Sequence, residues 1–181
     1  MLKEHARVLD VIRTAGEICG RKKLQKMIFI AKKLSFPFEE RFDFHFYGPY
    51  SEELTLKIEE LVNMGFLREE KEKKGNFLQY RYTLTESGER FLQLSPVAAP
   101  EALRTCVEDM NNQSPRFLEL VSTILYFDHL PEERVREKVR KVKSKQNYTG
   151  EEMDRAFQYI EQLRKWSRSE TIAFSGETEI L

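Results

Sequence analysis

Four side chains with acid, base or nucleophile chemistry lie close together in the sequence: Asp43, His45, Tyr47 and Ser51. If residues 41–47 form a strand, the first three share one face, because successive side chains of a strand alternate. Their types suggest hydrolysis, but a nucleophilic site also needs an oxyanion hole and a presented nucleophile. The chain has no G-x-S-x-G elbow and no phosphate-binding glycine loop. We therefore predict no catalytic residue and a protein that is not an enzyme.

The sequence offers no spacing typical of metal or cofactor ligands. His5, His45 and His129 lie far apart, and the chain has neither an H-x3-H pair nor a C-x2-C pair. Cys19 and Cys106 are too few for a disulfide framework or a zinc site. We predict no metal, no cofactor and a reducing, cytoplasmic location.

Positive charge gathers in two segments, although the 30 basic and 30 acidic residues of the whole chain cancel. Residues 21–33 form a basic helix face, and residues 134–145 hold seven basic residues and one acid. Such helices could contact phosphates with salt-sensitive, weakly specific affinity, or they could simply be solvated and paired with acidic neighbours. The candidate nucleic-acid contacts are Lys22, Lys23, Lys26, Arg136, Arg140, Lys141 and Lys143.

Aromatic residues crowd residues 36–50. In a strand over residues 41–47 three phenylalanines would share one face and pack into the core. The tyrosines on the other side are candidates for protein docking, because tyrosine combines a large apolar body with a polar tip. The candidate docking residues are Tyr47, Pro49 and Tyr50.

Hydrophobic periodicity and turn residues predict an α+β fold. The expected elements are helices over residues 3–15, 21–34, 52–63 and 86–94, a strand over residues 41–47 and a hairpin over residues 66–84. Gly48 and Pro49 should end the strand, and Ser51 should cap the helix that follows. This order predicts a winged helix-turn-helix-like domain over residues 1–95.

The third expected helix opposes DNA reading by a winged helix. In that fold the third helix enters the major groove, but "SEELTLKIEELVNMG" carries four glutamates and one lysine. Residues 35–50 also insert an aromatic segment where a helix-turn-helix has a short turn. Groove reading by this helix is therefore not expected.

Residues 95–100, "SPVAAP", form a proline-bounded linker. Beyond it the pattern predicts a helical region over residues 101–168 and a tail over residues 169–181. The helical region should pack on the first domain or mediate a homodimer. No stretch approaches the roughly 18 uncharged apolar residues that would span a bilayer.

Two quoted segments carry a family resemblance. "GRKKLQKMIFIAKKLSF" followed by "FHFYGPYSEELTLKIEEL" resembles the YwgA-like proteins of Firmicutes, and more distantly the Panacea or SocA-like phage-associated domains. The distant relatives imply an antitoxin-like or adaptor-like role through protein binding, with no catalytic residues to transfer. We therefore expect a cytoplasmic regulatory protein with a protein partner. The alternative is a DNA-binding regulator that contacts phosphates through residues 21–33 and 134–145.

Overall fold

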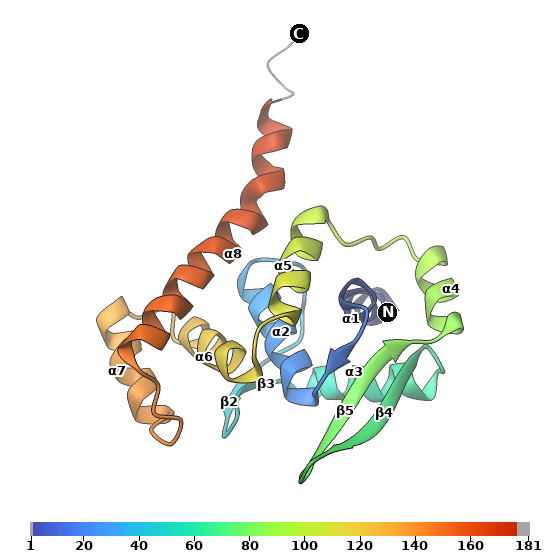
Figure 1. Cartoon of the computed structure of the whole chain (residues 1–181). Coiled ribbons are helices and arrows are strands. Elements are labelled where there is room, and N and C mark those ends of the chain that lie inside the picture. Colours follow the sequence, from blue (N-terminus) through green and yellow to red (C-terminus); the bar gives the residue numbers. More distant parts are fainter. Residues whose placement is uncertain (1, 177–181) are drawn as a thin grey trace.

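The computed structural model describes the backbone of residues 2–176 and the side chains of residues 2–169 (Figure 1). This part of the chain is a mixed α+β structure of eight helices and two small antiparallel sheets. The helices are α1 Leu2–Ala15, α2 Arg21–Lys33, α3 Glu52–Asn63, α4 Glu86–Leu94, α5 Glu101–Asn111, α6 Pro115–Tyr126, α7 Glu132–Val142 and α8 Gly150–Gly176. The strands are β1 Ile18–Cys19, β2 Asp43–His45, β3 Gly48–Tyr50, β4 Leu67–Lys74 and β5 Phe77–Leu84.

The larger sheet is built on the β4–β5 hairpin, which the sequence predicts. The sheet order is β1-β5-β4, so β5 is central and β4 is an edge strand. Leu67 pairs with Leu84 at the base, and Lys74 pairs with Phe77 beside the turn. β1 adds the third strand by pairing Ile18 with Tyr82. Figure 1 shows the hairpin projecting from the helices.

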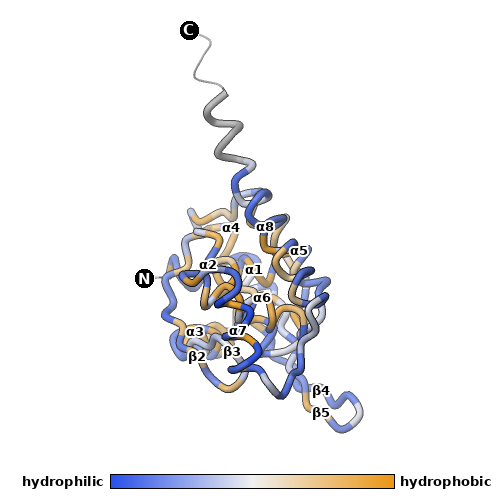
Figure 2. The backbone as a smooth tube through the Cα atoms, turned by 90° about the vertical axis from the view of Figure 1, so that its left-hand side faces the viewer, coloured by the Kyte–Doolittle hydropathy of each residue, from blue (hydrophilic) through white to orange (hydrophobic). Residues whose placement is uncertain are grey.

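One buried hydrophobic cluster joins the parts of the chain on either side of the 95–100 linker. α2 packs on α6 and α5, and α1 packs on α5. The fully buried residues Ile28, Leu118 and Met110 illustrate this shared core. Figure 2 shows the hydrophobic residues concentrated where these helices face one another. The predicted helical region therefore packs on the first domain.

Side chains that the sequence marks as helix caps begin the helices. Ser51 Oγ accepts a hydrogen bond from Leu54 N at 3.1 Å, and Thr85 Oγ1 accepts one from Gly88 N at 3.0 Å. Before α8, Glu152 N donates to Thr149 Oγ1 and Thr149 N donates to Glu152 Oε1, which is a capping box. α8 continues to Gly176 through the predicted tail, and residues 177–181 lie outside the described residues.

The sequence predicts one strand over residues 41–47 that ends at Gly48 and Pro49. This prediction is wrong. The chain reverses at Phe46 and Tyr47, and β3 pairs with β2 in a small hairpin, with Pro49 opposite Phe44. Antiparallel pairs alternate between hydrogen-bonded and non-hydrogen-bonded positions, so a two-stranded ribbon can hold a residue without an N–H. Phe46 consequently does not share a buried face with the other phenylalanines.

Gly88 fixes the approach of α4 to the loop before β4. A Cβ atom at this position would overlap the backbone carbonyl of Phe66. We expect Gly88→Ala to lower the free energy of unfolding by about 1–3 kcal/mol, because backbone or helix must move to accommodate the methyl group. Urea unfolding followed by circular dichroism measures this change.

Gly150→Ala is the matched control, because a Cβ there would meet nothing within 4 Å. Its free energy of unfolding should stay within about 1 kcal/mol of the wild-type value. Equal stabilities for the wild type and Gly88→Ala would contradict the close approach.

Candidate functional site at the β2–β3 hairpin

Two aromatic side chains project from the β2–β3 turn. Phe46 is 69% exposed and Tyr47 is 49% exposed. Their ring centroids lie 5.1 Å apart at an interplanar angle of 90°, which is the edge-to-face arrangement that aromatic pairs favour. We call these two residues the aromatic tip. Figure 1 shows the hairpin on the outside of the molecule, beside α6 and near the end of α7.

Two buried lysines hold the backbone on either side of the turn. Lys26, on α2 and 3% exposed, donates from Nζ to Pro49 O at 2.9 Å. Lys143, at the end of α7, donates to Phe46 O at 2.8 Å and pairs with Glu119 Oε1 at 2.6 Å. An ammonium is costly to bury unless its hydrogen bonds are satisfied, so these contacts strongly favour one hairpin position.

The electrostatic setting of Lys26 follows from its burial. Desolvation lowers the pKa of its ammonium to about 8. Nearby Glu119 opposes this change, whereas the positive charges of Lys143 and Lys22 add to it. Lys26 therefore carries its charge at neutral pH and loses it more readily than an exposed lysine does.

Gly48 allows the hairpin to lie against these lysines. Its φ of 90° is in the region that side chains rarely adopt. A Cβ there would also lie 3.5 Å from Lys26 Cε and 3.6 Å from Thr123 Oγ1. The backbone conformation of the turn therefore favours glycine, whereas both Cβ distances are ordinary van der Waals contacts with α2 and α6.

A glutamine amide on α2 anchors the chain as it leaves β3. Ser51 N donates to Gln25 Oε1, and Gln25 Nε2 donates to Ser51 O, each at 2.9 Å. Gln25 Nε2 also lies 3.1 Å from Thr55 Oγ1. Together with Lys26, this pair of hydrogen bonds fixes both the hairpin and the start of α3 on one helix.

Exposed amines surround the aromatic tip. Lys22 Nζ lies 3.2 Å from the ring centroid of Tyr47, and Lys145 Nζ lies 5.6 Å from that of Phe46. These are cation–π distances. The surface thus combines apolar rings with positive charge, a combination that suits a partner carrying both apolar and acidic groups.

The predicted docking residues divide among three environments. Tyr47 is exposed as expected, but Pro49 is buried and Tyr50 is half-buried. The Tyr50 hydroxyl lies 2.7 Å from Thr55 Oγ1, inside the protein. Sequence reasoning placed Phe46 in the core and missed it as a surface residue. The turn at residues 46–47 is what places Phe46 at the surface.

The candidate phosphate contacts are not one surface. Lys26 and Lys143, predicted on outer helix faces, are instead buried, because their ammonium groups bind the hairpin carbonyls. Their burial removes both from direct phosphate contact. Lys23 donates to the backbone oxygen of Asn111 and is half-buried. Lys22 remains exposed against Tyr47.

The α7 candidates differ in their partners. Arg136 binds Glu132 Oε1 at 2.9 Å and Asp154 Oδ1 at 2.6 Å. Arg140 and Lys141 are exposed, and no ion pair within 4 Å involves either among the described side chains. Together with Arg134, which is likewise exposed, they are basic residues of this helix that an external anion can reach.

The residues that first suggested hydrolysis lie in different environments. Asp43 and His45 are exposed, and the ring of His45 packs 5.1 Å from that of Tyr50. Both side chains point to solvent because β2 lies at the surface. Ser51 is fully buried, and its hydroxyl caps α3.

Neither a metal-binding cluster nor a membrane-spanning helix occurs among the described residues. No cluster of three or more histidine, cysteine, aspartate or glutamate side chains in this part of the chain has metal-binding geometry. Over the same residues, every helix is too short or too polar to cross a lipid bilayer.

The fold and the hairpin together define a small α+β protein that presents an aromatic tip from a lysine-anchored turn. No protein-family model matches the chain. It is 61% identical over 165 residues to Bacillus subtilis (strain 168) YwgA, described as an uncharacterised protein, and the match covers 91% of this chain and 99% of YwgA. The chain belongs to the YwgA family. The more distant resemblance to Panacea or SocA-like domains stays a prediction.

The buried ammonium of Lys26 should make stability depend on pH. Between about pH 8 and pH 10.5 the folded protein binds fewer protons at Lys26 than the unfolded chain does. The wild type should therefore gain stability relative to Lys26→Met as pH rises, by about 1–2 kcal/mol from pH 8 to pH 9.5. Urea unfolding of both proteins at each pH measures the difference.

Lys22→Met, which removes an exposed ammonium four residues earlier on α2, controls for the loss of one positive charge. A stability gap between the wild type and Lys26→Met that stays constant from pH 8 to pH 9.5 would contradict the lowered pKa.

Proposed function

We propose that this protein is a non-enzymatic, cytoplasmic regulatory module that binds another protein through the aromatic tip. The observation that supports this most is the exposure of Phe46 and Tyr47 on a turn whose backbone is hydrogen-bonded to two buried lysines. Most of the Phe46 surface and about half of the Tyr47 surface is left in contact with water. A partner that covered them would gain from their burial.

The geometry of the tip suits a binding hot spot. Aromatic residues dominate such sites because they bury a large area with few rotatable bonds. Lys26 and Lys143 fix the turn before any partner arrives, so less ordering opposes binding. Lys22 and Lys145 beside the rings favour a partner with acidic residues around an apolar contact.

The winged-helix interpretation is part of this proposal. Its support is the element order α1, β1, α2, β2, β3, α3, β4 and β5, in which β2–β3 is an insertion between α2 and α3 and β4–β5 would be the wing. The outer face of α3 carries exposed glutamates 52, 53, 59 and 60. Such a face would repel the DNA backbone, which favours an adaptor-like or antitoxin-like use of the fold.

Removing the aromatic tip should abolish partner capture. We expect the double variant Phe46→Ala/Tyr47→Ala to capture about one tenth as much partner as the wild type, or less. The reason is that each hot-spot side chain contributes about 2 kcal/mol or more to the free energy of binding. The measurement uses tagged full-length protein in a Bacillus subtilis lysate, with quantitative mass spectrometry of the proteins retained.

The matched control is Phe77→Ala/Leu78→Ala, which removes two exposed apolar side chains from the tip of β4–β5. This variant should keep its partner, and both variants should unfold at wild-type urea concentrations. Equal capture by the wild type and the Phe46→Ala/Tyr47→Ala variant would overturn the proposal.

A second candidate function is nucleic-acid binding, favoured by the exposed Arg140 and Lys141 on α7. If α7 contacts phosphates, labelled duplex should bind at low salt and dissociate steeply as salt rises. Arg140→Glu/Lys141→Glu should weaken that binding about tenfold or more, as read by fluorescence anisotropy. No binding of duplex or single strand at low salt would exclude this function.

A further inference from the structure

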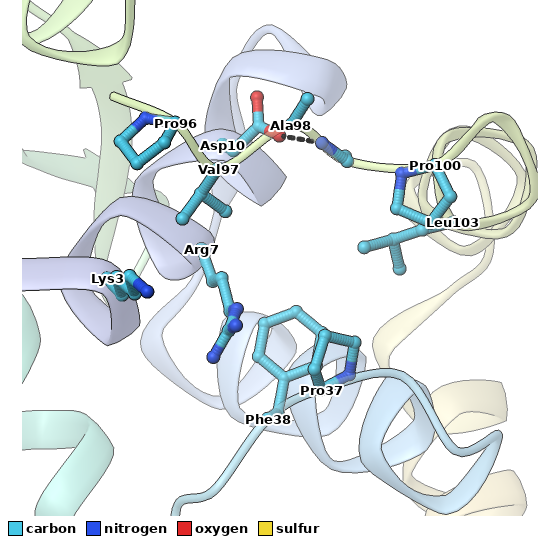
Figure 3. Close-up of a pocket in the computed structure, with 11 residues that line it drawn as sticks. Lys3, Arg7, Asp10, Pro37, Phe38, Pro96, Val97, Ala98, Pro100 and Leu103 are labelled. Atoms are coloured by element: carbon cyan, nitrogen blue, oxygen red, sulfur yellow. Dashed lines mark hydrogen bonds between the residues drawn. The ribbon is translucent and has the colours of Figure 1, made fainter. Parts of the chain in front are cut away.

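A cavity of about 290 Å³ lies between α1, the loop after α2 and the linker that precedes α5. This volume is close to the lower end of the range for small-molecule sites. Figure 3 shows Val97, Phe38 and Leu103 directed toward the same space from three parts of the chain. Pro37 and Pro100 complete the apolar wall. None of its lining residues belongs to the aromatic tip, so the cavity needs a separate explanation.

Two cations from α1 line this cavity. Lys3 and Arg7 are four residues apart, so they lie on one face of the helix. Figure 3 shows the Arg7 side chain extending into the space between Val97 and Phe38. Among the described side chains, no acid lies within 4 Å of either cation in an ion pair. Glu39 interacts with Arg7 only at longer range.

The acid in the wall is already satisfied. Asp10 is 2% exposed, and its Oδ1 accepts a hydrogen bond from Arg13 at 2.6 Å. Its Oδ2 accepts one from Ala99 N at 3.0 Å, the contact marked in Figure 3. Asp10 therefore fixes the linker across the cavity and is not available to bind Arg7. The linker is thus held to α1, the helix that carries both cations, before any ligand binds.

We propose that this cavity binds a small organic carboxylate with an apolar body. The apolar body would lie against Val97, Phe38 and Leu103, and the carboxylate would meet Arg7 and Lys3. A planar guanidinium pairs well with a planar carboxylate through two parallel hydrogen bonds. The negative charge of Glu39 offsets part of the positive charge, so a singly charged anion fits better than a doubly charged one.

The test is an NMR titration of the full-length protein with 3-phenylpropionate as the probe. We expect saturable shifts of the backbone amides of Ala98 and Leu103, which line the cavity. The neutral 3-phenylpropanamide should bind at least about tenfold more weakly, because it lacks the charge-assisted hydrogen bonds. Phenyl phosphate, largely doubly charged at pH 7.5, should also bind more weakly than the carboxylate.

Two variants separate charge from shape. Arg7→Gln should weaken the probe about tenfold or more, whereas Arg134→Gln, which removes an exposed charge on α7, should change its affinity less than about twofold. Val97→Phe should fill the cavity and prevent binding while the remaining spectrum stays dispersed.

Four results would overturn the proposal. The first is that the chemical shifts of the cavity amides do not change when the probe is in 20-fold molar excess and above about 10 mM. The second is that the amide and the carboxylate bind equally well, and the third is that Arg7→Gln and Arg134→Gln weaken binding of the probe equally. Stronger binding of phenyl phosphate would assign the cavity to phosphate esters and would overturn the carboxylate. None of these results bears on capture by the aromatic tip.

Discussion

The burial of two lysine ammonium groups constrains the arrangement of the whole molecule. Each must find an acceptor in the interior, and each finds a carbonyl of the β2–β3 hairpin. Lys26 and Pro49 are 23 residues apart, whereas Lys143 and Phe46 are 97 residues apart. The hairpin therefore depends on the packing of α2, α6 and the end of α7. Its exposed rings are a consequence of how its backbone is held.

Local signals in the sequence were sufficient for most of the helices and for the β4–β5 hairpin. Ser51, Thr85 and Ser114 cap helices because their hydroxyl groups reach backbone N–H groups three residues later. The hairpin followed from alternation on both sides of Gly75 and Asn76. These features depend only on residues close in sequence, which is why spacing alone predicts them.

The candidate site was only partly predictable, because its contacts join distant segments. Nothing near Lys26 in the sequence indicates that its amine reaches Pro49 instead of solvent. A basic helix face is normally exposed. Proline lacks an N–H and therefore predicts a break at Pro49, yet a two-stranded ribbon has room for it. Tyr47 was correctly placed at the surface, but Phe46 required knowledge of where the chain turns.

The edge position of β4 has a consequence for the behaviour of many copies in solution. An edge strand has unpaired backbone groups that can template pairing with another molecule. Along β4, "LREEKEKK", all but the first side chain are charged, so a neighbouring copy would have to desolvate a dense row of lysines and glutamates. This strand should therefore resist edge-to-edge aggregation, even though Phe77 and Leu78 on β5 expose apolar surface beside it.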